Sequence, residues 1–174
     1  MFKLVDRERL KTPQDRSLWE SLKVRKPARL AAMIDRQLQG TTATAVLAGA
    51  ETWSRPWVRY EIARSLVRGN GLLTVFIDGC KCPREGFSYR GHNPLSFIAL
   101  GWDNRIYELN ANGVWVLYSK ITETVTSWPK WLARPDRNYC MPLDVGTLAY
   151  DWISGNGRAN LVHWTNLAAI AAGK

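Results

Sequence analysis

Residues 41–78 read "TTATAVLAGAETWSRPWVRYEIARSLVRGNGLLTVFID", and this stretch decides the fold. Its two ends, 41–49 and 72–78, are short β-branched and apolar runs, the pattern of strands buried on both faces of a parallel sheet. Between them the pattern predicts a helix, with Ser54 as its N-cap and Pro56 in its first turn. The order strand, helix, strand predicts a right-handed βαβ crossover in an α/β fold.

This interpretation makes specific side chains part of the core. Gly69 and Gly71 are expected to end the helix. Apolar residues of both runs are expected to be buried in adjacent parallel strands. They are Val46, Leu47, Leu73, Val75 and Ile77.

A second helix is predicted upstream. The segment 26–40, "KPARLAAMIDRQLQG", places Leu30, Ile34 and Leu38 four residues apart and therefore on one helical face. Its proline near the first turn and its glycine beyond the last are the usual boundary signals of a helix. Helices are thus expected on both faces of the sheet.

Downstream of the second strand the pattern changes. Residues 104–121 favour a β-hairpin with its turn at Asn112-Gly113. Residues 126–143 contain three prolines and two tryptophans, which favours an irregular surface stretch. A short strand and turn over 148–157 and an alanine-rich helix over 158–174 are expected to close the chain. The hairpin and the irregular stretch form an insertion in the α/β pattern.

Composition limits the function classes. The 24 Lys and Arg residues exceed the 15 Asp and Glu residues, giving a net charge of +9 that attracts phosphates, nucleic acid or acidic partners. The basic residues are scattered and match no DNA- or RNA-binding motif, so a solvated basic surface is favoured over a nucleic-acid face. No apolar run approaches the roughly 20 residues that span a bilayer, and the N-terminus lacks a secretory signal, so we expect no membrane partner and a cytoplasmic protein.

Cysteine and histidine residues do not indicate a metal centre. The three cysteines form an odd set, and Cys80 and Cys82 are too close in sequence for an ordinary disulfide. Together with Cys140, His92 and His163 they supply zinc-type ligands, but a Cys-x-Cys pair lacks the usual spacing. Free thiols and no bound metal are expected.

Three separated motifs carry a resemblance to a known family. They are "IDRQLQGTTATAVLAGAETWSRPWVRYEIARSLVRGNGLLTVFID" at 34–78, "GHNPL" at 91–95 and "YDWISGNGRANLVHWTNLAAIAAGK" at 150–174. Over 18–174 the chain resembles the TIR-like family that includes the TIR subunit of Thoeris antiphage defence. The resemblance implies a flavodoxin-like parallel sheet with helices on both faces, in one domain over 1–174.

The N-terminus departs from that family. Its members begin with an apolar strand that ends in an "F-x-S-F"-like or "F-I-S-Y"-like motif, and this motif is missing here. Either "MFKLV" at 1–5 takes that strand position in degenerate form, or the chain starts downstream of the strand. Residues 1–17 are therefore expected to be divergent or truncated.

The resemblance also implies an activity and its central residue. TIR enzymes hydrolyse or cyclise NAD with one glutamate, and the family pattern "W-V-x-Y-E-I" falls on residues 57–62, with Glu61 at the catalytic position. NAD is then a substrate, and no cofactor is implied. A carboxylate suits this reaction because cleavage of the nicotinamide bond develops positive charge on the ribose. The alternative is that Glu61 only pairs with Arg55, Arg59 or Arg64 on an exposed helix.

Three other residues are candidates for substrate binding. Ser54 and Trp57 flank the helix N-terminus, where backbone N–H groups attract phosphate, although capping and core packing explain both residues equally well. Asn93 lies on the "GHNP" loop, but an asparagine before proline is more often a turn former. Glu61 itself is expected at the carboxyl edge of the sheet, facing a cleft.

Three functions remain open at this point. The first is an NAD-consuming enzyme of antiphage defence that releases nicotinamide and makes ADP-ribose or a cyclic ADP-ribose-type signal. The second is a non-catalytic module that assembles with itself or with an effector protein. The third, a nucleotide- or nucleic-acid-binding domain, rests on net charge alone.

Overall fold

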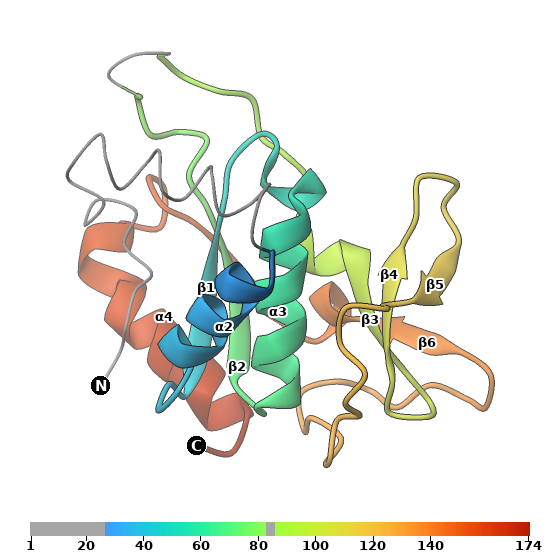
Figure 1. The fold of residues 1–174 in the computed structure, drawn as a ribbon. Helices are drawn as coiled ribbons and strands as arrows, with labels where there is room; N and C mark the ends of the chain where they lie inside the picture. Colours follow the sequence, from blue (N-terminus) through green and yellow to red (C-terminus); the bar gives the residue numbers. More distant parts are fainter. Residues whose placement is uncertain (1–26, 83–85) are drawn as a thin grey trace. The chain divides into compact units, whose positions relative to one another are not determined.

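A computed structural model describes residues 27–82 and 86–174 (Figure 1). Its contacts divide the chain into two units, 1–41 and 42–174. In the first unit, helix α2 spans Pro27–Gln37 and buries Leu30 and Ile34. The helix predicted upstream is therefore confirmed, and Leu38 just beyond it is buried as well.

The second unit contains a three-stranded parallel sheet. Strands β1 (Ala43–Ala48), β2 (Gly71–Phe76) and β7 (Leu148–Asp151) lie in the order β1-β2-β7. Both pairings are parallel. Parallel neighbours need crossover connections, and helix α3 (Pro56–Val67) supplies the one between β1 and β2. The α/β fold predicted from 41–78 is confirmed.

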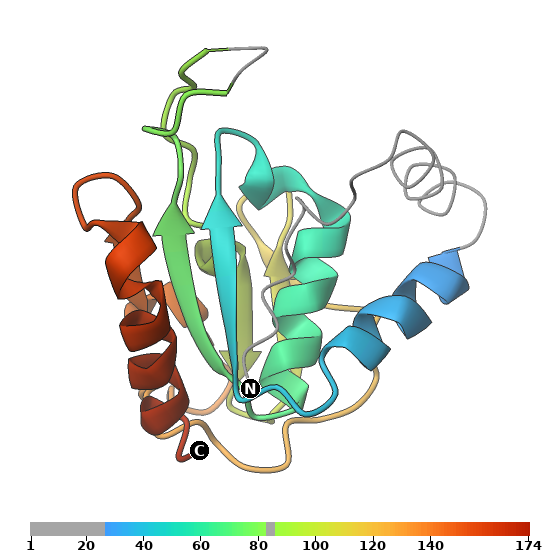
Figure 2. The ribbon, with the colours of Figure 1, turned by 90° about the vertical axis from the view of Figure 1, so that its left-hand side faces the viewer.

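Helices α3 and α4 (Gly157–Ala171) lie on opposite faces of β1 and β2 (Figure 2). On the α4 side, Trp164 and Ala168 pack with Leu73 and Val75 of β2 in a buried cluster. The ring of Trp164 also stacks on Tyr150 of β7, with centroids 4.2 Å apart. These contacts fix α4 against the middle of the sheet.

Helix α3 contacts β1 and β2 and buries Ile62 and Leu66 completely or nearly so. Its buried Ser65 shares a 2.8 Å hydrogen bond with Thr44 of β1. Ser65 lies toward the end of α3 and Thr44 toward the start of β1. The helix therefore runs back along the strand from its carboxyl end.

Burial of the apolar residues agrees with the prediction in β2 but not throughout β1. Leu73 and Val75 of β2 are fully buried, as expected for a central strand. In β1 burial alternates, with Val46 buried and Leu47 39% exposed, so the expectation that Leu47 is buried is wrong. In the described part of the sheet β1 pairs only with β2, so it is an edge strand there, and α4, which packs mainly on Leu73 and Val75 of β2, covers its second face only in part. Ile77 is half-buried and follows the end of β2.

A second, antiparallel sheet occupies the insertion. It comprises β3 (Ile98–Gly101), β4 (Ile106–Leu109), β5 (Trp115–Leu117) and β6 (Cys140–Pro142), in the order β5-β4-β3-β6. The predicted hairpin is confirmed by the antiparallel β4–β5 pair. The stretch 126–143 was expected to be irregular throughout, and β6 within it corrects that prediction.

Three 3-10 turns complete the described part of this unit. They are η2 (Thr52–Ser54), η3 (Pro94–Phe97) and η4 (Leu143–Val145). Turns η2 and η3 contact each other near the start of α3. None of the helices in the described ranges has both the length and the apolar character needed to cross a membrane.

Candidate functional site

Glu61 is the sixth residue of α3 and is half-buried. At 100° per residue it shares a helical face with Trp57 and Arg64, on the opposite side from the buried Ala63 and Leu66. The Glu61 position therefore lies toward the outer face of α3, next to the buried Ser65 one turn later. Helix α3 begins at the carboxyl edge of the sheet, and Glu61 lies about 7–8 Å along the helix axis from Pro56, so the expectation that its carboxylate faces a cleft at that edge stays a prediction.

Two of the arginines expected to pair with Glu61 bind other carboxylates. Arg59 forms a 3.1 Å ion pair with Glu108 of β4, and Arg64 forms a 2.7 Å ion pair with Glu123. The hydrogen bond from Arg64 holds the pKa of Glu123 below its usual range. Both ion pairs join α3 to the segment that carries the second sheet, so they hold the helix on either side of Glu61.

Arg59 is the more extensively bound of the two arginines. Its guanidinium also donates to the carbonyl oxygens of Trp53, at 3.3 Å, and Leu109, at 3.1 Å. It lies 5.3 Å from the ring centre of Phe97. Its side chain is only 15% exposed, where charge-assisted hydrogen bonds are stronger than in water. Arg59 thus connects the first half of α3 to η2, η3 and β4.

Trp57 lies one turn before Glu61 on the same face of α3. Its half-buried ring meets Tyr60 edge to face, with centroids 5.6 Å apart. The Lys120 ammonium lies 5.4 Å from the centre of the Trp57 ring. An aromatic ring with a cation beside it, and a carboxylate one turn further along, therefore lie in the first half of α3.

Ser54 does not cap α3. It is the last residue of η2, and its hydroxyl donates to the carbonyl oxygen of Glu51 at 2.9 Å. Arg55 takes the N-cap position and makes no side-chain capping hydrogen bond, while Pro56 begins the helix as predicted. The prediction of Ser54 as N-cap is wrong because the preceding 3-10 turn uses its hydroxyl locally.

Asn93 is the side-chain cap of η3. Its Oδ1 accepts from the Leu95 backbone N–H at 3.0 Å and from the buried Thr74 hydroxyl of β2 at 2.7 Å. Because a backbone N–H only donates, these bonds fix the orientation of the amide and leave its NH2 group on the other side. The turn-forming interpretation of Asn93 is confirmed, and the residue is also tied to the central strand.

Aromatic contacts bring the loops of Ser54 and Asn93 together. Trp53 stacks on Phe97 with centroids 4.8 Å apart, and His92 meets Trp53 edge to face at 5.2 Å. A Cβ on Gly91 would lie 2.4 Å from the carbonyl oxygen of Ala50, so the "GHNP" loop follows the loop after β1 very closely. The two loops therefore share the carboxyl edge of the sheet.

We expect Asn93→Ala to lower the free energy of unfolding by about 1–3 kcal/mol, because it leaves the fully buried Thr74 hydroxyl without its acceptor. Chemical denaturation measures the loss. Adding Thr74→Val removes the unpaired hydroxyl and should recover part of that loss. If the losses in unfolding free energy of the two single variants simply add in the double variant, the two side chains are not coupled through this hydrogen bond.

A further cluster at this edge was missed by the sequence analysis. Arg90 pairs with Asp78 at 3.2 Å and with Asp151, and its guanidinium lies 4.5 Å from the ring centre of Phe76. The backbone N–H of Ser154 holds the pKa of Asp151 below its usual range. The sequence did contain a signal for this cluster. Asp78 and Asp151 stand at the ends of two predicted strands, and the carboxyl ends of parallel strands meet at one edge of the sheet.

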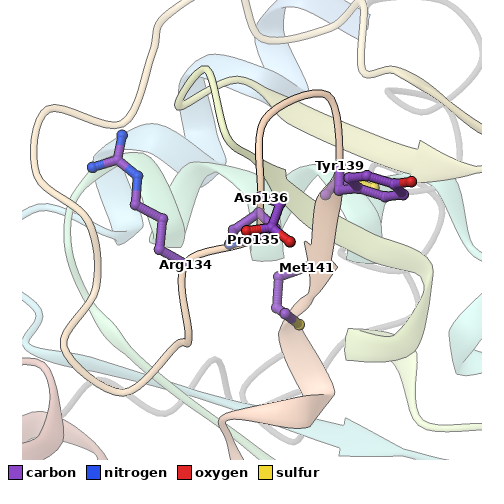
Figure 3. A pocket seen from close by; sticks show the side chains of 6 residues that line it. Arg134, Pro135, Asp136, Tyr139 and Met141 are labelled. Atoms are coloured by element: carbon purple, nitrogen blue, oxygen red, sulfur yellow. The ribbon is translucent and has the colours of Figure 1, made fainter.

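A surface pocket of about 380 Å³ lies between β6 and the loop before it (Figure 3). It is lined by Arg134, Pro135, Asp136, Tyr139, Cys140 and Met141. None of the predicted site residues lines it. Over 27–82 and 86–174, no group of three or more His, Cys, Asp and Glu side chains is arranged to hold a metal ion.

Comparison with known proteins identifies relatives of the chain. Residues 3–81 match the model of the family described as Thoeris protein ThsB, TIR-like domain. The match includes β1, α3 and Glu61, and also residues 3–17, which lie outside the described ranges. The chain is 28% identical over 159 residues to "Putative cyclic ADP-D-ribose synthase ThsB1" of Bacillus cereus (strain MSX-D12), covering 87% of this chain and 80% of the relative. The predicted resemblance is thereby confirmed: residues 3–81 are similar to the TIR-like domain of the Thoeris ThsB family, and the likeness to ThsB1 extends over most of the chain.

Proposed function

We propose that this chain is a TIR-type enzyme of antiphage defence that consumes NAD, releasing nicotinamide and forming a cyclic ADP-ribose-type signal or ADP-ribose. The observation that carries the proposal is Glu61, which lies on α3 within the residues that match the family model and which the resemblance implies as the catalytic glutamate. The name of the Bacillus cereus relative, "Putative cyclic ADP-D-ribose synthase ThsB1", supports the same reaction class.

The chemistry requires little beyond a well-placed negative charge. Breaking the bond between nicotinamide and ribose develops an oxocarbenium-like ribose, and the Glu61 carboxylate stabilises that charge or holds the ribose hydroxyls. Nicotinamide leaves as a neutral molecule, so a strong general acid is not needed. In the cyclising reaction a nucleophilic atom of the same ADP-ribose attacks the ribose, and in hydrolysis water attacks it.

The surroundings of Glu61 suit this role. A carboxylate stabilises a transition state most when it is fixed in advance, and the ion pairs of Arg59 and Arg64 hold α3 on both sides of it. Trp57, one turn away, offers an aromatic surface for a base of NAD, and Lys120 beside it attracts the pyrophosphate. Ser54 and Asn93, on loops joined through Trp53 and His92, are the further proposed contacts to substrate.

The direct experiment incubates the purified chain with NAD over a series of protein concentrations, with separation of the products by chromatography. We expect nicotinamide to appear in equal amount to ADP-ribose plus its cyclic form. Folded protein that leaves NAD intact at every concentration would overturn the enzyme proposal and favour a non-catalytic assembly module.

The nucleic-acid alternative has a separate test. It rests only on the net charge of +9. A protein that binds DNA through phosphates loses affinity linearly with the logarithm of salt concentration. We expect no DNA binding at physiological salt, and tight binding of arbitrary duplex DNA with a steep salt dependence would favour this alternative instead.

A further inference from the structure

Arg59 joins two loops at the carboxyl edge of the sheet, 49–55 after β1 and 91–97, which ends in η3; we call them the edge loops. The first supplies Trp53 and the second Phe97, and their rings stack with centroids 4.8 Å apart. The Arg59 guanidinium contacts both loops. Its Nε donates to the Trp53 carbonyl oxygen at 3.3 Å, and the group lies 5.3 Å from the centre of the Phe97 ring. One side chain of α3 therefore connects the edge loops to each other.

The Arg59 guanidinium is itself fixed by the second sheet. Its Nη1 donates to the Glu108 carboxylate and to the Leu109 carbonyl oxygen of β4, each at 3.1 Å. A guanidinium is planar and holds its N–H groups in set directions, so acceptors on different sides fix both its position and its orientation. A lysine ammonium is a compact point charge without this planar fork. It can pair with Glu108 but cannot reproduce the whole set of contacts.

The surroundings of Arg59 favour an indirect role over direct contact with substrate. Its side chain is only 15% exposed, and its charge is already paired with Glu108. Arg59 and Glu61 are two residues apart on α3, so their side chains leave the helix about 160° apart around its axis. Arg59 therefore faces the edge loops and β4, and the Glu61 position faces another side of the helix.

We propose that Arg59 is a positioning residue that holds the edge loops in the arrangement that binds NAD. This inference rests on the proposed function, which places Ser54 and Asn93 against the substrate. Ser54 directly follows Trp53, whose carbonyl oxygen Arg59 binds. Asn93 is the N-cap of η3, which ends at Phe97. Loosening the loops weakens the binding of substrate and transition state alike, so it raises KM and leaves kcat nearly unchanged.

Steady-state kinetics of NAD turnover by the full chain tests this role with Arg59→Lys. The KM for NAD should rise about tenfold or more, while kcat stays within about threefold of wild type. Arg134→Lys is the matched control. Arg134 also combines a hydrogen bond to a carbonyl oxygen, that of Trp102, with an aromatic ring, that of Trp128, but it is exposed on the loop before β6. Its KM and kcat should equal those of wild type.

Amide hydrogen exchange, followed by mass spectrometry, measures the edge loops without any substrate. Each loop contains backbone hydrogen bonds whose amides report local opening, among them those of Ser54 and Ser96. In Arg59→Lys the edge loops should exchange about tenfold or more faster than in wild type. Exchange in β2 and α4 should keep its wild-type rate, because only a general loss of stability would speed it there. The control variant should match wild type throughout.

Glu108→Gln decides the question if Arg59→Lys does not fold. It removes the ion pair that orients the guanidinium but keeps an acceptor oxygen, so KM and loop exchange should both rise by a smaller factor, about threefold. Wild-type loop exchange in the folded variants, or a fall in kcat at unchanged KM, would overturn the positioning role. Folded wild type that leaves NAD intact would instead overturn the proposed function, and loop exchange would still show whether Arg59 fixes the edge loops.

Discussion

Gly71→Ala is expected to lower the free energy of unfolding by about 3 kcal/mol or more, at or above the upper end of the usual range for overpacked positions. A Cβ at this first residue of β2 would lie 2.0 Å from the carbonyl oxygen and 2.3 Å from the carbonyl carbon of Ala168 in α4. Both atoms belong to the backbone, so relief requires α4 to move away from the sheet. That movement opens the cluster of Leu73, Val75 and Trp164.

Urea denaturation compares Gly71→Ala with wild type and with a control, Gly49→Ala. A Cβ at Gly49 meets only the Thr52 hydroxyl, at 3.7 Å, which is ordinary contact. The control should lie within about 0.5 kcal/mol of wild type. Equal stability of Gly71→Ala and wild type would contradict the close docking of α4 on β2.

Gly71 also shows what local patterns can and cannot reveal. The sequence predicted that Gly69 and Gly71 end the preceding helix. Gly69 does so, with a φ of 68° just after the helix. Gly71 instead begins β2 and admits α4, a helix that starts 86 residues later in the chain, at Gly157. No local pattern contains that contact, whereas the apolar run of β2 is itself a local pattern and was predicted.

Apart from its hairpin, the second sheet was not predicted, because its other pairing joins segments that are far apart in the chain. Its strands have three or four residues each, too few for alternation to be recognised. β3 pairs with β6, which follows about 40 residues later and ends in Pro142. Proline is tolerated in β6 because the strand lies at the edge of the described sheet, but in a sequence it argues against any strand. Only the hairpin β4–β5, with its local turn, could be predicted.

For the candidate site, the sequence could nominate residues but could not predict their contacts. The motif identified Glu61, and helical periodicity relative to Ile62 and Leu66 was sufficient to place it on the outer face of α3. The carboxylates that bind Arg59 and Arg64 come from Glu108 and Glu123, 49 and 59 residues away in sequence, so the local charge pattern could not reveal them. These long-range ion pairs are what make α3 a fixed support for Glu61.

Glu61→Gln is expected to lower the rate of nicotinamide release from NAD by about a hundredfold or more. The substitution keeps the size and hydrogen-bonding capacity of the side chain and removes its charge. A preorganised charge that acts on a transition state contributes a few kcal/mol, which corresponds to a loss of this size. Because Glu61 is half-buried at the outer face of α3, the unfolding transition should stay close to that of wild type.

Glu51→Gln is the matched control. Glu51 is an exposed carboxylate on the loop between β1 and α3, so its substitution makes the same change in net charge near the same helix. Its rate should remain within about twofold of wild type, a difference below about 0.5 kcal/mol. A comparable loss in both variants would mean that overall charge, and not the position of Glu61, governs the reaction.

The most direct measurement is the rate of nicotinamide release at saturating NAD, determined side by side for wild type, Glu61→Gln and Glu51→Gln at the same high protein concentration. The account predicts release by wild type and by Glu51→Gln, and a loss of about a hundredfold or more confined to Glu61→Gln. Equal rates for wild type and Glu61→Gln, or no release by folded wild type, would contradict it.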